Sequence, residues 1–164
     1  MVETLAIDLG CGDHGRGDLC VTKKGERSTC NATSHLDVHL ERYGFKHRPD
    51  AEVINGDIED PEVLLYLGQR IKEGVSVRVL CCHVIEHLKS PYGFLENVMD
   101  FITPDSLVIV TPNAVTNWQA DYNDRGHLYS FTPASLHHLV SRFFTVRLEY
   151  LIANDLDILL EAGK

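Results

Sequence analysis

Some stretches of the 164-residue chain are apolar runs, and in others the apolar residues recur at helical spacing. The two kinds of stretch alternate, which predicts strands separated by helices. Runs rich in apolar and β-branched residues predict strands, and helical spacing returns after three prolines, a residue that favours the first turn of a helix. The pattern is hardest to interpret over 13–34, where the polar run at 23–27 predicts a turn or an exposed loop. The predicted strands are 4–10, one ending at 34–38, then 51–57, 75–84, 107–110, 144–152 and 156–161, with helices opening at Pro61, Pro91 and Pro133.

The order of these elements predicts an α/β fold, a doubly wound and mainly parallel seven-stranded sheet covered by helices on both faces. The last two strands have no helix between them, only a turn near Asn154 and Asp155. Strands joined so closely pair antiparallel, so we expect a C-terminal antiparallel hairpin. With no internal repeat or linker, residues 1–164 are expected to form a single domain.

A glycine-rich turn follows the first predicted strand, whose residue Asp8 precedes Gly10, Gly12, Gly15 and Gly17. Glycines let a backbone turn sharply and approach a ligand closely, and open α/β sheets bind ligands at the carboxyl ends of their strands. The same residues would also suit a tight strand-to-helix turn without a ligand. Both interpretations stay open on this segment alone.

The turn resembles the first motif of class I S-adenosylmethionine-dependent methyltransferases, an acid followed by alternating glycines. His14 stands where that family usually has glycine, and Gly15 would take its place through a one-residue shift. Later segments resemble further motifs in the same order, and those after the predicted fourth strand look like the branch that methylates small molecules. These segments are 55–59, 82–88, 111–113 and 126–132. The resemblance implies a Rossmann-like methyltransferase fold.

The resemblance also implies S-adenosylmethionine as the cofactor. In that family an acid such as Asp57 faces the adenine amine and an apolar neighbour such as Ile58 packs on the ring. Asp37, or Glu41 instead, would accept hydrogen bonds from the ribose hydroxyls. Without a cofactor, Asp57 would be an acid at a helix N-terminus and Asp37 a solvated acid. The candidate cofactor-binding residues are Asp8, Gly10, Cys11, Gly12, Gly15, Asp37, Asp57, Ile58, Cys82 and His83.

On the acceptor side, the resemblance points to His83, His87 and His127 as candidate catalytic residues. The expected reaction is attack of an acceptor atom, which we expect in a small molecule, on the sulfonium methyl group. A general base is needed only if the acceptor loses a proton, and histidine has a suitable ordinary pKa. The aromatic side chains of the polar loop that follows could form a wall of an acceptor pocket or pack without one: Trp118, Tyr122 and Tyr129.

A zinc site is the rival interpretation of the same segment, because His83, Glu86 and His87 have the spacing of the inverted zincin motif. That chemistry needs both histidines on one helical face. The apolar residues before and between them favour a strand instead. We therefore expect neither zinc nor another bound metal.

Composition narrows the remaining possibilities. The formal net charge of −9 argues against broad binding to nucleic-acid phosphates. No apolar run reaches membrane-spanning length, no signal peptide is evident, and the five cysteines fit reduced thiols, so a cytoplasmic protein is expected. The chain begins at its first strand, without the helices that cap the acceptor site in the resembling family. The alternative function is therefore a catalytically inactive, cofactor-binding subunit, and a homodimer or a partner chain could cover the acceptor site.

Overall fold

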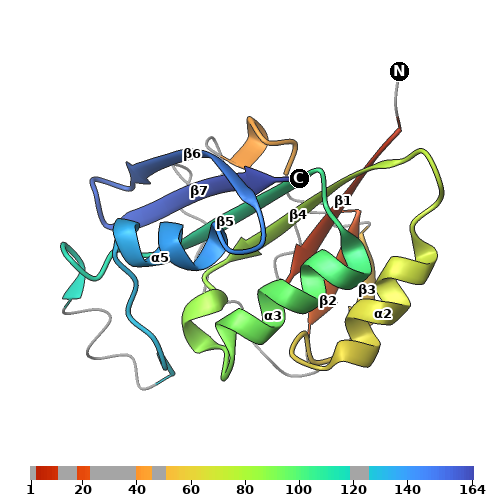
Figure 1. Cartoon of the computed structure of the whole chain (residues 1–164), viewed down its shortest axis with the longest axis horizontal. Coiled ribbons are helices and arrows are strands. Elements are labelled where there is room, and N and C mark those ends of the chain that lie inside the picture. The colour runs from red at the N-terminus through yellow and green to blue at the C-terminus, as the bar shows by residue number, and fades with distance from the viewer. Residues whose placement is uncertain (1–2, 11–17, 23–39, 46–50, 119–125) are drawn as a thin grey trace.

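A seven-stranded sheet organises the computed structural model, which describes residues 3–10, 18–22, 40–45, 51–118 and 126–164 (Figure 1). The strand order is β3-β2-β1-β4-β5-β7-β6. The five strands from β3 to β5 pair in parallel, and β7 pairs antiparallel with both β5 and β6. The strands are β1 (Thr4–Leu9), β2 (Leu19–Thr22), β3 (Glu52–Asn55), β4 (Ser76–Cys82), β5 (Ser106–Pro112), β6 (Thr145–Ile152) and β7 (Asp157–Gly163). The predicted α/β fold with a C-terminal antiparallel hairpin is confirmed.

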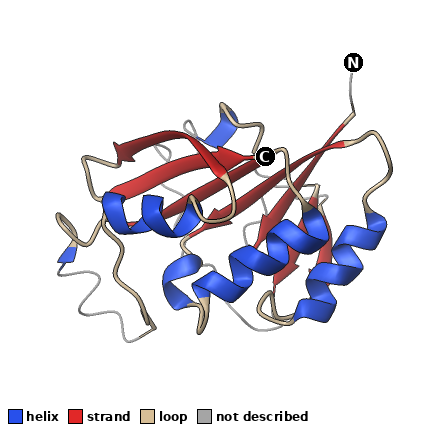
Figure 2. Cartoon of the chain, viewed as in Figure 1, coloured by secondary structure: helices blue, strands red, loops and turns tan. Residues whose placement is uncertain are grey.

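Helices cover one face of this sheet (Figure 2). They are α2 (Pro61–Arg70), α3 (Pro91–Asn97), the π-helical turn η2 (Val98–Ile102) and α5 (Pro133–Val140). Each α-helix begins with the predicted proline, directly after a side chain that accepts a hydrogen bond from a backbone N–H of the first turn. These caps are Asp60, Ser90 and Thr132. No helix in the described part of the chain has both the length and the apolar character needed to cross a membrane.

Successive side chains of the central strands point to opposite faces of the sheet, so the hydrophobic core has two parts, one on each face. Ile7, Leu9 and Val79 pack with the helices, whereas Leu80 and Val108 face the opposite side. Leu40 and Phe45, from the short helical turn at 40–45, cover this second face among the described residues. Burial on both faces explains why the central strands are continuous apolar runs.

The second strand differs from the sequence-based expectation. It is β2, Leu19–Thr22, which pairs with β1 and β3 and so fills the position we assigned to a strand ending at 34–38. Asp18 fixes its start, because its backbone N–H donates to the carbonyl of Ala6 at 2.7 Å and its carboxylate accepts from the N–H of Ala6 at 2.9 Å. Four residues of strand within a polar segment give little periodicity, so the sequence did not indicate this strand, and residues 34–38, where we expected it to end, lie outside the described residues.

The fourth strand and the first helix are both shorter than predicted. β4 ends at Cys82, and a 3₁₀ helix, η1 (Ile85–His87), follows where we expected the strand to continue to residue 84. The apolar spacing of Leu64, Leu67 and Ile71 predicts a helix that Gly74 terminates, but α2 ends at Arg70 and Gly74 lies in the turn that follows. The altered boundary of β4 matters more, because it changes the directions of His83 and His87.

Gly10 is required both by its backbone conformation and by its surroundings. Its φ is +80°, and a Cβ there would lie 2.5 Å from Cγ2 of Val84. Gly74 has the same φ of +80°, but a Cβ added there would meet nothing within 4 Å, so this glycine supplies a matched control. Any substitution at Gly10 therefore changes packing against Val84 as well as access to a ligand.

We expect Gly10→Ala to destabilise the protein more than Gly74→Ala. The left-handed backbone costs each alanine about 1 kcal/mol, and the clash with Val84 adds about 1–3 kcal/mol at position 10 alone. Urea denaturation of the two variants and the wild type measures both effects. Equal free energies of unfolding for the two variants would show that Val84 moves aside without cost.

Candidate active site

The carboxyl ends of the parallel strands bring together segments that are far apart in sequence. Asp8 and Gly10 lie at the end of β1, Asp57 follows β3, and η1 follows β4. The loop carrying His127 joins them, because the N–H groups of Leu128 and Tyr129 donate to the carbonyl oxygen of Glu86 at 2.8 and 3.1 Å. The structure thus places the segments of η1 and His127 next to each other, as the sequence predicts.

Several predicted cofactor-binding residues lie at this edge. Asp8 is 2% exposed at the end of β1, and Ile58 is buried after β3. Asp57 accepts a hydrogen bond from the N–H of Glu59 at 3.0 Å, whereas Asp60 is the residue that caps α2. Cys82 is the buried last residue of β4. The remaining predictions fall outside the described residues: Cys11, Gly12, Gly15 and Asp37.

The alternative ribose-binding acid, Glu41, does not lie at this edge. Its neighbours Arg42 and Tyr43 line a cavity together with Ser76 and Ser106, the first residues of β4 and β5. This places the 40–45 segment beside the amino ends of those strands. Glu41 is an exposed acid in this segment, so the placement of its neighbours does not support a role as ribose ligand, which stays a prediction.

Glu86 is the buried acid of the site, with 1% of its surface exposed. One carboxylate oxygen, Oε2, accepts a hydrogen bond from the Thr111 hydroxyl of β5 at 3.0 Å. The other, Oε1, has no hydrogen-bond partner among the described residues. It lies 3.5 Å from Nδ1 of His83 and 4.0 Å from Nε2 of His87. A buried carboxylate with one unsatisfied oxygen is costly unless something else binds it.

His83 connects this acid to β7. Its Nδ1 contacts Glu86 and its Nε2 lies 3.6 Å from a carboxylate oxygen of Asp157, the first residue of β7. Its φ of +53° is unusual for a residue with a side chain, and such strain often marks a functional site. Burial by itself lowers the pKa of His83, but the contacts with Asp157 and Glu86 raise it to about 10. His83 is thus protonated at neutral pH, which does not fit a general base.

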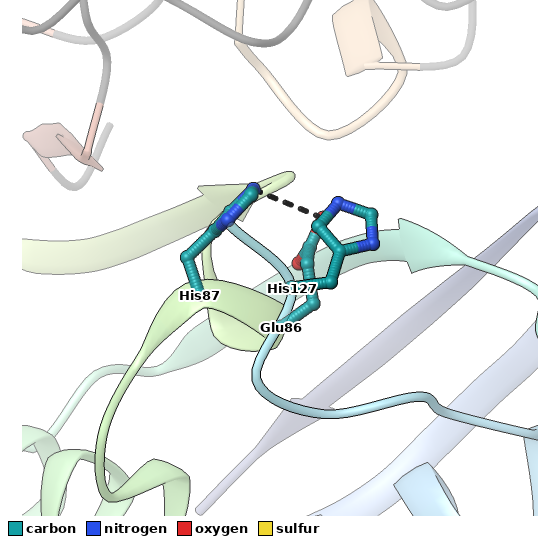
Figure 3. A group of neighbouring side chains, drawn as sticks. All are labelled: Glu86, His87 and His127. Atoms are coloured by element: carbon teal, nitrogen blue, oxygen red, sulfur yellow. Dashed lines mark ion pairs between the residues drawn. The ribbon is translucent and has the colours of Figure 1, made fainter. Parts of the chain in front are cut away.

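His87 and His127 are better placed to bind a ligand or a proton. Their rings meet edge to face, with 4.6 Å between ring centroids (Figure 3). Nε2 of His87 is buried without a hydrogen-bond partner in the described part of the chain. One ligand atom from each of Glu86, His87 and His127 lies within 4.8 Å of the other two. One carboxylate and two imidazoles with open positions are a donor set that suits divalent transition metals.

This geometry does not fit the zincin interpretation, and it also removes the reason for which we expected no metal. The three-residue group includes His87 and His127 and omits His83, so the spacing of the inverted zincin motif does not correspond to a shared ligand set here. We expected no metal because residues 84 and 85 were predicted to continue a strand, but Ile85–His87 form a 3₁₀ helix. The two buried atoms of Glu86 and His87 without a hydrogen-bond partner belong to the group that could hold a divalent cation.

Sequence reasoning did not single out Thr111 or Asp157 as site residues. Asp157 reaches the site because antiparallel β7 begins at the edge where β5 ends, with Pro112 opposite Asp157 in the register. The predicted antiparallel hairpin could have indicated Asp157, because the second strand of that hairpin must start at the carboxyl edge of the sheet. Among the aromatic residues, Trp118 and Tyr129 are 58% and 42% exposed, and Tyr122 lies outside the described residues.

Comparisons with solved structures find methyltransferases. The small RNA methyltransferase HEN1 is 16% identical with a TM-score of 0.63, and the match covers 100% of this chain and 23% of that one. The N-terminal domain of EvdMO1 with SAH bound is 15% identical with a TM-score of 0.55, covering 98% and 74%. The pyocyanin biosynthetic protein PhzM is 14% identical with a TM-score of 0.56, covering 99% and 51%. No protein-family model and no curated protein matches the sequence. At these identities the likeness establishes the fold.

We expect the protonated His83 to make stability depend on pH. A pKa raised from 6.5 to about 10 stabilises the fold fully below pH 6.5, and this contribution is lost as the pH rises towards 10. His83→Gln should therefore flatten the fall in Tm between those pH values, whereas His138→Gln, on the exposed side of α5, should not. Thermal melts in a chelating buffer measure this. A wild-type Tm that falls no more steeply than that of His83→Gln would contradict the charge assigned to His83.

We also expect one divalent cation to bind at Glu86, His87 and His127. Calorimetric titration with Mn²⁺ should show one site in the wild type, and Glu86→Gln or His87→Ala should weaken it by at least about tenfold, because the first removes the charge of a ligand and the second removes a ligand. His138→Gln is the control with an unchanged site. Absence of Mn²⁺ binding, together with a metal-free elemental analysis, would instead support the sequence-based expectation.

Proposed function

We propose that this chain, which has the fold of class I S-adenosylmethionine-dependent methyltransferases, transfers a methyl group from S-adenosylmethionine to an acceptor held beside Glu86, His87 and His127. The observation that carries this proposal is the pair of buried atoms without a hydrogen-bond partner on Glu86 and His87, in the segment that follows Val84, which packs against Gly10 at the end of β1. A structural neighbour with SAH bound supports the choice of cofactor.

In the proposed reaction, the acceptor atom attacks the sulfonium methyl group and the sulfur leaves with the electron pair of the broken bond. The chain contributes alignment and a shielded, negatively charged site, because Asp8 and Glu86 are buried carboxylates. If the acceptor is a hydroxyl or a protonated amine and no metal is bound, His87 or His127 accepts its proton. A divalent cation held by Glu86, His87 and His127 would supply Lewis acidity that favours the deprotonated acceptor.

For the acceptor we propose a small molecule. The formal charge of −9 disfavours binding of long nucleic acids, and the pyocyanin biosynthetic protein PhzM shares the fold. RNA is the second candidate, favoured by the likeness to HEN1 over the whole chain. Transfer of labelled methyl to short RNA duplexes, compared with a panel of alcohols, phenols and amines, distinguishes the two. Labelling of RNA alone would replace the small-molecule proposal.

A partner chain or a second copy could complete the acceptor site. Leu128, whose N–H donates to the carbonyl of Glu86, is 57% exposed, and Val115 and Trp118 in the loop after β5 are 64% and 58% exposed, which leaves apolar surface uncovered. An inactive, cofactor-binding subunit remains the alternative, and it would bind SAH without methylating any acceptor tested. We also propose a cytoplasmic location, which the odd cysteine count and the adjacent Cys81 and Cys82 support.

We expect cofactor affinity and methyl transfer to respond to different residues. Asp57→Asn should weaken SAH binding by about tenfold through loss of a charged hydrogen bond to the adenine amine. Asp60→Asn makes the same change three residues away, where asparagine still caps α2, and should leave affinity unchanged. Calorimetry with SAH measures both. No binding by the wild type at millimolar SAH would exclude the proposed function.

In a chelating buffer, His127→Ala should instead leave SAH affinity within a few-fold and lower the single-turnover rate by about a hundredfold, as expected for a lost acid–base group. The reason is that His127 comes from a loop late in the chain, whereas Asp8 and Gly10 lie at the end of β1 and Asp57 follows β3, where we propose that the cofactor binds. An unchanged rate would make His127 a packing residue. A collapse of affinity would place its loop in the cofactor site.

A further inference from the structure

We propose that a second site, at the amino edge of the sheet, binds a phosphate-bearing ligand. A cavity of about 370 Å³ opens there, beside Ser76 and Ser106, the first residues of β4 and β5. The candidate active site follows the last residues of the same two strands, so the two sites lie at opposite edges. Cavities of roughly 300–1,000 Å³ hold small molecules.

Three arginines line this cavity: Arg42, Arg78 and Arg147. They are three of the nine arginines in a chain whose formal net charge is −9. Among the described residues, no ion pair joins any of the three to an Asp or Glu side chain, and Arg147 donates a hydrogen bond to the main-chain oxygen of Lys164 at 3.4 Å. Guanidinium groups that converge on one space without carboxylate partners favour an anion, and their planar donors match phosphate oxygens.

The two acids in the cavity wall have other partners. Asp105 accepts a hydrogen bond from the N–H of Val77 at 2.9 Å and lies 3.4 Å from Nζ of Lys164. Glu161 accepts from the Ser106 hydroxyl at 3.2 Å. The backbone hydrogen bond from Val77 contributes most to lowering the pKa of Asp105, so this carboxylate stays charged with its own partners in place. Neither acid forms an ion pair with the three arginines, and each of Arg78 and Arg147 uses only one of its donors on a main-chain oxygen, so further guanidinium N–H groups can bind an anion.

Two glycines and a strand irregularity make room for these arginines. A Cβ at Gly44 would lie 2.6 Å from a guanidinium nitrogen of Arg78, and a Cβ at Gly163 would lie 2.7 Å from the guanidinium of Arg147. Arg147 sits where the β6–β7 register shifts between Val146 and Leu148, and such bulges redirect a side chain. Arg78 is further held by donating to the Tyr43 carbonyl at 3.0 Å. The arginines are thus positioned by backbone features of several elements.

Titration with inorganic pyrophosphate at constant ionic strength tests this site. We expect saturable binding to the wild type by calorimetry, weakened about tenfold in Arg147→Gln and in Arg42→Gln because each loses a charge-assisted hydrogen bond. Arg142→Gln, on an exposed arginine after α5, makes the same change in net charge and should bind within twofold of wild type. Absence of saturable binding, or equal loss in the Arg142 variant, would overturn the proposal.

Two further measurements separate this site from the active site and identify the source of the phosphate. SAH affinity should be unchanged in the Arg42 and Arg147 variants, so failure here leaves the proposed methyl transfer intact. Competition against pyrophosphate by ADP would assign the site to a small phosphorylated molecule. Competition by a single-stranded oligonucleotide, with none by ADP, would assign it to the phosphodiesters of a nucleic acid.

Discussion

The buried carboxylate of Glu86 is the group on which the carboxyl edge of this protein depends. It binds the Thr111 hydroxyl of β5, while its backbone carbonyl holds the loop of His127 through two N–H groups. His83 continues the contact to Asp157 of β7. A charge with 1% exposure is tolerated only where paired, so these segments are kept in place by the need to satisfy it.

The negative charges at the carboxyl edge of the sheet are only partly balanced by positive charges, and a net negative charge suits the proposed methyl transfer. Protonated His83 offsets one of the two carboxylates it touches, Glu86 and Asp157, which leaves one negative charge. Asp8 adds a further buried acid nearby, and burial together with Asp8 and Glu86 raises the pKa of the Cys81 thiol well above its usual range. A net negative pocket attracts a cation, and both a divalent metal and the sulfonium of the cofactor are cations.

Most of the fold could be predicted from the sequence because β1, β4 and β5 are buried on both faces and therefore consist of long apolar runs. The second strand could not, because Leu19–Thr22 is four residues long and is defined by pairing with β1 and β3. At the site, Glu86, His87 and His127 lie in segments that resemble methyltransferase motifs. Asp157 acts through the register of an antiparallel strand, and no local pattern around it indicates a ligand.

The histidines show why spacing alone does not determine a site. On a regular helix, His83 and His87 would share one face and could bind one metal. Here β4 ends at Cys82, and the positive φ of His83 turns the chain before η1 begins. His83 is thereby directed to Asp157, and the ring of His87 meets that of His127, which comes from a much later loop. The same short segment thus supplies one positioning charge and one ligand, and the second imidazole comes from the tertiary fold.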